Sequence, residues 1–448
     1  MKKKIKLSSS QIVLVGFLGV ILIGSLLLSL PVSSSGGEGV SYIDALFTAT
    51  TATCVTGLVT VPTFSAWSTF GHIVILFLIQ IGGLGVVTVT AGIMLIFVKK
   101  IGIGGRLIIM DAFNLSSLSG IIKFVKKVIA GTLIAEAAGA VLYMTVLVPE
   151  FGVKGIWYSV FNSISAFCNA GIDIIGENSL CDYVKNPMMN FVTSALIIAG
   201  GLGFIVWWDI QDMLSGKKQR RLRHLTLHTK IVLFVTAVLL LGGTVLLFVF
   251  EYNNPRTIGD FTLFEKWQAS FFQSVTTRTA GFAALPQENL TNASAFLSII
   301  LMFTGGSPVG TAGGVKTVTV FVLILTAISV IKNKSNTEVF QRRIRTEAIK
   351  KSVAVFFFSF AVFFISTLLL AAVNDGDILS IMYETVSATA TVGLTRSFTP
   401  SLNTAGKVII IATMYLGRVG PISIAFAFKG KSKNENAVIS AAEDITIG

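Results

Sequence analysis

The sequence predicts an all-α polytopic membrane protein in which four similar units follow one another. Three observations favour this fold class: the chain carries little charge, it contains long apolar runs, and one short motif recurs at a quarter of its length. Of the 448 residues, 53% are hydrophobic and only 13% are charged, whereas about 25% are charged in an ordinary soluble domain. The mean hydropathy of +0.80 indicates more apolar residues than a buried core requires.

The apolar residues are concentrated in runs long enough to cross a bilayer. A helix of about 20 apolar residues spans a hydrocarbon core of about 30 Å, and we expect about eight such spans. The first run follows Lys2, Lys3, Lys4 and Lys6, as in a secretory signal, but it exceeds the usual length of about 7–15 residues. We therefore interpret it as an uncleaved first span. The clearest runs are Gln11 to Leu30, His72 to Val98, Ile231 to Phe250, Ala354 to Val373 and Val408 to Phe428.

The distribution of basic residues predicts the orientation of the chain. The net charge is +13, and 26 of the 35 Lys and Arg residues fall in five segments. By the positive-inside rule, both termini and the three basic linkers face the cytoplasm, and the chain crosses the cell membrane many times. These linkers lack the interleaved aromatic residues of a nucleic-acid interface, so we expect the lipid bilayer and no nucleic acid as a partner. The segments are residues 2–6, 99–127, 217–230, 332–351 and 429–433.

Four short segments rich in Ser, Thr and Ala end in glycine. Their glycines lie 114, 110 and 112 residues apart, and one quarter of 448 is 112. This regularity divides the chain into repeats at 1–100, 101–216, 217–334 and 335–430, followed by a cytoplasmic tail at 431–448. The segments are Thr51–Leu58, Ala166–Ile172, Thr277–Phe282 and Ala388–Leu394, with glycines Gly57, Gly171, Gly281 and Gly393.

A short amphipathic stretch precedes each glycine segment. Each stretch has 10 to 13 residues, too few to cross the bilayer, so we expect re-entrant pore helices. Non-helical backbone at membrane depth is tolerated only where it is buried in protein or lines an aqueous cavity. Four such segments predict span–pore-helix–filter–span repeats with pseudo-fourfold symmetry around one pore. The stretches are Ser41–Thr53, Tyr158–Phe167, Glu265–Thr277 and Ile378–Ala390.

The glycine segments have the chemistry of a cation filter. Rings of backbone carbonyls can replace the hydration shell of a cation, and glycine adopts the dihedral angles that turn successive carbonyls to one side. Each half-helix also directs the negative end of its dipole towards the cavity. The alternative is four ordinary helix C-caps that end in glycine. The predicted ion-binding residues are Val55, Thr56, Gly57, Asn169, Ala170, Gly171, Thr279, Ala280, Gly281, Thr391, Val392 and Gly393.

The segment Thr391-Val392-Gly393 is similar to the potassium-channel filter motif TVGYG, with Leu394 and Thr395 in place of Tyr and Gly. Four unequal units with one filter glycine each resemble the Trk/Ktr/HKT potassium-transporter superfamily, and in particular the membrane subunit of bacterial Ktr systems. In that family, glycine at all four positions goes with potassium and serine at the first goes with sodium. The resemblance therefore implies K+ as the transported ion. It also implies a homodimer with one pore per subunit, and a cytosolic ring of nucleotide-binding regulatory subunits that would hold any nucleotide.

The second span of the third repeat is interrupted. Thr304 to Gly314 reads TGGSPVGTAGG, and a stable helix does not run through five glycines and a proline. This segment resembles the intramembrane gate loop of the Ktr family, and we expect it to obstruct conduction rather than merely to kink a helix. We expect Arg418 to lie near the pore axis, bonded to loop carbonyls; the alternative is snorkelling to the cytoplasmic surface. The predicted gate residues are Gly305, Gly306, Ser307, Gly310, Thr311, Gly313, Gly314 and Arg418.

Similar glycine clusters, Gly82-Gly83-Leu84-Gly85 and Gly200-Gly201-Leu202-Gly203, occur in the second spans of the first two repeats. A dinucleotide-binding fingerprint is excluded because both clusters lie inside apolar spans and follow no strand. We interpret them as close helix packing through small residues.

Two charged residues in apolar surroundings have no obvious partner. Glu136 and Arg278 could pair with each other, or each could bond to backbone groups. Glu136 would also be the protonatable residue of an ion-coupled secondary transporter, which stays an alternative, as does a sodium-preferring or poorly selective cation pore. We expect no enzyme, because paired catalytic carboxylates, a nucleophile elbow and a Walker lysine are absent from the sequence.

Overall fold

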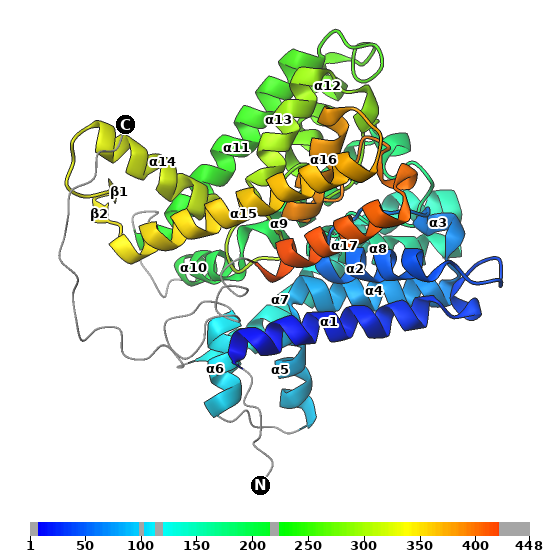
Figure 1. Cartoon of the computed structure of the whole chain (residues 1–448), viewed down its shortest axis with the longest axis horizontal. Helices are drawn as coiled ribbons and strands as arrows, with labels where there is room; N and C mark the ends of the chain where they lie inside the picture. Colours follow the sequence, from blue (N-terminus) through cyan, green and yellow to red (C-terminus); the bar gives the residue numbers. More distant parts are fainter. Residues whose placement is uncertain (1–7, 98–102, 113–119, 216–223, 421–448) are drawn as a thin grey trace.

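The computed structural model describes residues 8–97, 103–112, 120–215 and 224–420, which are almost entirely helical (Figure 1). The predicted tail at 431–448 and parts of the basic segments lie outside the described residues. Within them, a single hairpin pairs β1 (Glu338–Val339) with β2 (Arg342–Arg343).

Each quarter of the chain repeats a long helix, a pore helix and a second apolar helix. The pore helices are α2, α8, α12 and α16, close to the predicted stretches, although α8 begins at Val153 instead of Tyr158. The first quarter contains α1 (Ser9–Leu28), α2 (Tyr42–Cys54), α3 (Thr63–Ala66), α4 (Thr69–Leu84) and α5 (Val86–Phe97). The second contains α6 (Ile103–Ala112), α7 (Ile121–Phe151), α8 (Val153–Cys168), α9 (Pro187–Leu202) and α10 (Phe204–Leu214). The third contains α11 (Leu227–Glu251), α12 (Leu263–Thr276), α13 (Asn292–Phe303) and α14 (Thr317–Ile331), and the fourth α15 (Thr346–Val373), α16 (Ile378–Ala390) and α17 (Thr404–Val419).

Local sequence fixes where the pore helices begin. The side chains of Ser41, Thr262 and Asp377 each accept a hydrogen bond from the backbone amide three residues later. Such N-caps satisfy amides that have no partner within the helix. At the opposite ends, α2, α8 and α16 terminate in a residue with left-handed backbone angles, so the chain leaves each helix abruptly and enters the glycine segment.

The sequence predicts about eight spans, and the described helices provide four, or up to six if each bent pair counts as one span. Four described helices, α1, α7, α11 and α15, are long and apolar enough to cross a membrane, and each precedes one of the four pore helices. The second spans differ from one another. The pairs α4–α5 and α9–α10 bend by 98° and 97°, α13 and α14 are short and separated by a loop, and α17 ends where the described residues end.

The structure adds a bend to the close packing predicted for the first two glycine clusters. Close packing itself is confirmed: a Cβ at Gly82 would collide with the Thr53 carbonyl, and one at Gly200 with that of Phe167. The helices nevertheless break immediately afterwards, at Gly85 and Gly203, whose φ values are 82° and 89°. These angles are not helical, and residues with a side chain rarely adopt them.

The helices close into a ring. Within each quarter, the long helix packs on the pore helix that follows it, as α1 does on α2 and α7 on α8. Between quarters, the second helix packs on the next pore helix: α4 on α8, α9 on α12, α13 on α16, and α17 back on α2. The contact from the last quarter to the first gives the assembly its pseudo-fourfold symmetry.

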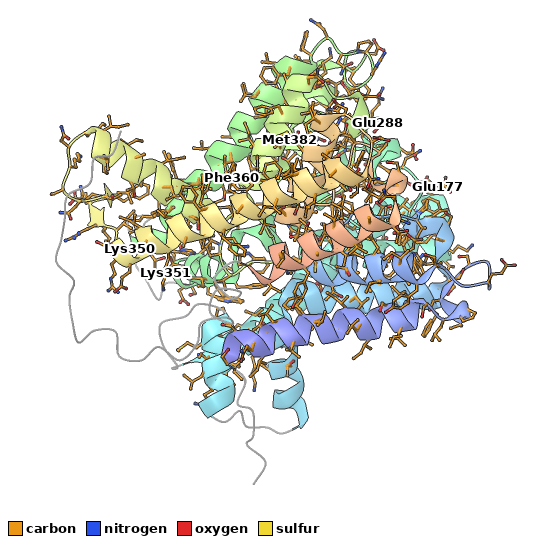
Figure 2. The ribbon with its side chains drawn as sticks, viewed as in Figure 1. Glu177, Glu288, Lys350, Lys351, Phe360 and Met382 are labelled. Atoms are coloured by element: carbon orange, nitrogen blue, oxygen red, sulfur yellow. The ribbon has the colours of Figure 1, made fainter. Side chains whose placement is uncertain are left out.

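The two ends of this helical assembly differ in charge. In Figure 1, α14 and the β1–β2 hairpin extend away from the pore helices. Figure 2 shows Lys350 and Lys351 at the same end of the molecule, at the start of α15, whereas Glu177 and Glu288 lie towards the opposite end. These two lysines and two glutamates are thus separated along the direction of the long helices.

Candidate functional site: a ring of four glycine segments above an interrupted helix

In each glycine segment, the residue two positions before the glycine has left-handed backbone angles. The φ values of Val55, Asn169, Thr279 and Thr391 lie between 51° and 65°. The glycine two residues later also has positive φ in every repeat, reaching 103° at Gly57 and 104° at Gly393. At those two positions a side chain would be strained, so glycine is required there by the backbone itself.

Hydroxyl groups of the pore helices hold these segments in place. Thr51 Oγ1 accepts a hydrogen bond from the amide of Gly57 at 2.9 Å, and Ser387 Oγ accepts one from Gly393 at 2.9 Å. In the third repeat, Thr276 Oγ1 donates to the carbonyl of Phe282 at 2.7 Å. Side chains six residues away in the sequence therefore hold the backbone of these segments.

The four segments meet around one axis. A Cβ placed on each glycine would collide with a carbonyl oxygen of the neighbouring segment, that of the residue directly before the neighbour's own glycine. This relation runs through all four repeats and closes on itself. The pairs are Gly57 with Ala170, Gly171 with Ala280, Gly281 with Val392, and Gly393 with Thr56. The four glycines and the residue before each of them thus form one compact ring of backbone, with the carboxyl ends of four pore helices directed at it.

The interrupted segment between α13 and α14 lies against this ring. Thr311 Oγ1 donates to the Phe167 carbonyl at 3.0 Å and to Asn169 Oδ1 at 3.1 Å. The Gly313 amide donates to Thr279 Oγ1 at 3.0 Å, and a Cβ on Gly313 would collide with Thr391 Oγ1. Residues 304–316, called the loop below, therefore contact the second, third and fourth glycine segments.

The bend at Gly203 provides the loop with hydrogen-bond partners. The carbonyls of Gly200 and Gly201 accept from the amides of Thr311 and Ser307, at 3.1 and 2.9 Å, and Phe204 donates its amide to Val309 at 2.9 Å. A helix that continued past Gly203 would use these groups internally. The broken second span of repeat 2 and the loop of repeat 3 thus satisfy each other's backbone hydrogen bonds. The sequence did not reveal this relation.

Arg418 joins the loop to the first repeat. Its Nη1 donates to the Thr311 carbonyl at 2.7 Å and its Nη2 to the Gly82 carbonyl at 2.5 Å. The side chain is half-buried and points to these carbonyls, so snorkelling to the cytoplasmic surface is the wrong interpretation. A guanidinium carries several donors in one plane and is suited to bridging two carbonyls on different elements.

The family of the chain follows from comparison with known proteins. The sequence profile of the TrkH family, described as "Cation transport protein", matches residues 8–437. The chain belongs to the TrkH family of cation transport proteins. This agrees with the resemblance found in the sequence, and membership places the chain among ion transporters and not among enzymes.

The relatives within the TrkH family cover nearly the whole chain. The potassium/sodium uptake protein NtpJ of Enterococcus hirae is 40% identical over 98% of this chain and 97% of its own length. The Ktr system potassium uptake protein B of Bacillus subtilis is 39% identical over 97% of this chain and 96% of its own. That of Vibrio alginolyticus is 36% identical over 100% and 96%.

A solved structure supports the fold. The crystal structure of the potassium transporter TrkH from Vibrio parahaemolyticus matches with a TM-score of 0.74 over 96% of this chain and 86% of that one, at 18% identity. The chain is accordingly a multi-pass membrane protein with the TrkH fold.

Glu136 and Arg278 do not pair in this TrkH-family chain. Glu136, only 5% exposed, accepts from Gln80 Nε2 at 3.3 Å and from Cys168 Sγ at 3.8 Å. Arg278 donates to the Gly305 carbonyl at 3.4 Å. Of the two possibilities left open by the sequence, Arg278 takes a backbone partner, whereas Glu136 bonds to side chains of the neighbouring repeat and of its own.

Two further residues were not identified from the sequence. Lys316, at the end of the loop, donates from Nζ to the Ala312 carbonyl at 2.5 Å; its proximity to the gate motif was the available signal. Asp173 lies two residues beyond Gly171 and accepts from Ser179 Oγ at 2.7 Å. Burial raises the pKa of Asp173 to about 6, against the opposing effect of the Ser179 bond, so this carboxyl group titrates near physiological pH.

Proposed function

We propose that the chain takes up K+ by passing it through the ring formed by the four glycine segments. The observation that carries this proposal is the cyclic relation of each glycine to the carbonyl of the next segment. Four converging carbonyl groups per level are the ligands that replace water around K+. The names of the relatives, potassium/sodium uptake protein and Ktr system potassium uptake protein B, support the same ion class.

The ring residues would act as the selectivity filter and the loop as the gate. The predicted gate residues lie between the glycine segments and the side to which we assign the basic linkers. With Thr311 bonded to Arg418 and Gly313 against Thr391, the loop would close the path beneath the filter. The four repeats would then be the functional units at 1–100, 101–216, 217–334 and 335–430.

The driving force would be electrical. A monovalent cation gains about 2.3 kcal/mol per 100 mV on moving to the negative side, and both termini would lie on that cytoplasmic side. Any nucleotide hydrolysis would take place on a partner protein and not on this chain. We infer a homodimer and a cytosolic nucleotide-binding ring as partners, docked on the basic surface that includes Lys350 and Lys351.

The test is ion flux into liposomes that contain only this purified chain. K+ flux well above Na+ flux supports the filter assignment. Equal fluxes, or a preference for Na+, favour the sodium-preferring or poorly selective pore, a candidate that the name of the Enterococcus relative also supports.

A variant shortened within residues 304–314 resolves the case in which the wild-type chain passes neither ion. Flux through the shortened variant would show that the pore is present and held shut by the loop. No flux through either protein, with both correctly folded, contradicts the proposal.

A further inference from the structure

A buried cation lies behind the third glycine segment. Arg278 stands between the end of α12 and Thr279, and its side chain is only 7% exposed. Among the described residues, its guanidinium has one hydrogen-bond partner, the Gly305 carbonyl at 3.4 Å, and no carboxylate pairs with it. The Nε atom is buried and has no partner in this part of the chain. Arginine stays protonated in proteins, so a full positive charge is buried here.

The groups around Arg278 compensate this charge only in part. Transfer of an ion into a protein interior is strongly unfavourable unless an opposite charge or several good hydrogen bonds accompany it. The carboxyl end of α12 contributes a partial negative charge, and the bond to Gly305 is longer than most hydrogen bonds of this type. A further, negatively charged partner would therefore stabilise Arg278.

Arg278 borders a cavity between repeats 2 and 3. The cavity lies between α9, α11 and the end of α12, and its volume is about 20 Å³. This is enough for one particle of about the size of a water molecule or a halide ion, and too little for a lipid chain. The walls are largely apolar and include Ile197, Leu202, Leu240 and Val275.

The polar side chains that line this cavity can donate hydrogen bonds and lack acceptors. Thr236 faces it from α11, and the buried Oγ1 of Thr236, like Nε of Arg278, has no partner among the described groups. The two glycines in the wall, Gly201 and Gly306, have carbonyls that already accept backbone amides at 2.9 and 3.0 Å. A guanidinium and a hydroxyl around one small space fit a ligand that accepts hydrogen bonds and carries negative charge.

We propose that this cavity binds one small monovalent anion, chloride in the cell, between Arg278 and Thr236. The anion is a resident ligand and is not transported. It screens the Arg278 charge from K+ at the ring, whose residue Ala280 lies two positions further along the chain. Without the anion, the cation opposes K+ through a protein interior of low dielectric constant. This screening rests on the proposed function, since it matters only if K+ passes the ring.

Binding is tested with bromide, which replaces chloride and is located by its anomalous scattering in crystals of the full chain. We expect one bromide ion within hydrogen-bond distance of Arg278 and Thr236 in the wild type, and none there in Arg278→Met. A water molecule at this position in the wild type overturns the proposal. A bromide ion that persists in Arg278→Met is an adventitious ion only, which also overturns it.

Thermal unfolding of the purified chain measures the same site in solution. The unfolding temperature should rise as chloride replaces gluconate, which is too large for the cavity, at constant ionic strength. Thr236→Val should raise the chloride concentration of half-maximal stabilisation by about tenfold, because one hydrogen bond to a charged group is lost. Thr244→Val is the matched control on α11, since the Thr244 hydroxyl already donates to the Leu240 carbonyl at 2.6 Å. Equal shifts in both variants, or no chloride dependence in the wild type, overturn the site.

K+ flux into liposomes tests the screening. Replacement of chloride by gluconate on both sides should reduce wild-type flux by at least about tenfold. Arg278→Met removes the charge together with the need for an anion, so its flux should be the same in both salts, whereas Arg278→Lys should keep the dependence. Wild-type flux that is equal in both salts overturns the screening. If Arg278→Met does not fold, Arg278→Gln takes its place under the same criteria.

Binding and flux separate this inference from the proposed function. A bound bromide ion without K+ flux in any variant, including the chain shortened within residues 304–314, contradicts the pore and supports the anion site. Absence of both the bromide ion and the chloride-dependent stabilisation contradicts the anion site, whatever the fluxes.

Discussion

Substitution of Gly393 by serine tests the carbonyl ring most directly. Gly393 has a φ of 104°, where a residue with a side chain is strained by about 1–3 kcal/mol. A Cβ there would also collide with the Thr56 carbonyl oxygen and lie 2.8 Å from Gly57 Cα. Both neighbours are backbone, so neither can rotate away, and the Thr56 carbonyl must leave its place in the ring.

The expected result is a loss of discrimination rather than a loss of the protein. If a strain of about 1–3 kcal/mol weakens the binding free energy of K+ by the same amount and leaves that of Na+ unchanged, the K+/Na+ permeability ratio falls by roughly 5- to 150-fold. Reversal potentials under bi-ionic conditions, measured on the reconstituted chain, give this ratio directly. Gly176→Ser is the matched control, because a Cβ on Gly176 meets no atom within 4 Å and its backbone is unstrained. An unchanged ratio in a folded Gly393→Ser protein would refute the assignment of this ring as the filter.

Three further predictions concern charged groups. Arg418→Gln removes two hydrogen bonds to carbonyls on different elements, each worth about 1.5–3 kcal/mol when charged, so K+ flux through the purified chain should rise by at least about tenfold; no rise in a folded variant contradicts a gating role. The pKa of Asp173 is raised to about 6, so the group is negative above that pH and neutral below it. Lowering the external pH from about 7.5 to about 5 should therefore reduce K+ influx roughly two- to fourfold by removing one charge near the filter, and Asp173→Asn should abolish this dependence. Glu136→Gln retains the shape of the side chain beside Gln80, so K+ flux should stay within about twofold of wild type at both pH values; a proton-coupled transporter would instead lose its response to an imposed proton gradient.

The repeated architecture was predictable because most of its signals are local. Apolar runs indicated the long helices α1, α11 and α15, and the glycine spacing indicated four similar units. The pore helices followed from stretches too short to span a bilayer, and N-cap residues such as Ser41 and Asp377 stand at their starts. The signals for span length, pore helices and N-caps each lie within about 20 residues of sequence, whereas the glycine signal is a recurrence at intervals of 110 to 114 residues.

The bends were not predictable, since glycine in an apolar helix is compatible with both close packing and a break. Gly82 and Gly200 serve packing, whereas Gly85 and Gly203 end their helices. What distinguishes them is whether the backbone groups freed by a break find other partners. At Gly203 those partners are Ser307, Val309 and Thr311, about 100 residues further along the chain.

By itself, the sequence determined the fold class and located the four glycine segments with the short helix before each of them. Only the tertiary structure decided what holds the loop beneath them. The bond from Thr311 to Asn169 joins positions 142 residues apart, and that from Arg418 to Gly82 joins positions 336 apart. Such partners depend on closure of the ring, in which α17 packs against α2. The physical reason is that helix length and periodicity are properties of a segment, whereas a buried charge or a free carbonyl is satisfied by whichever group the whole fold brings to it.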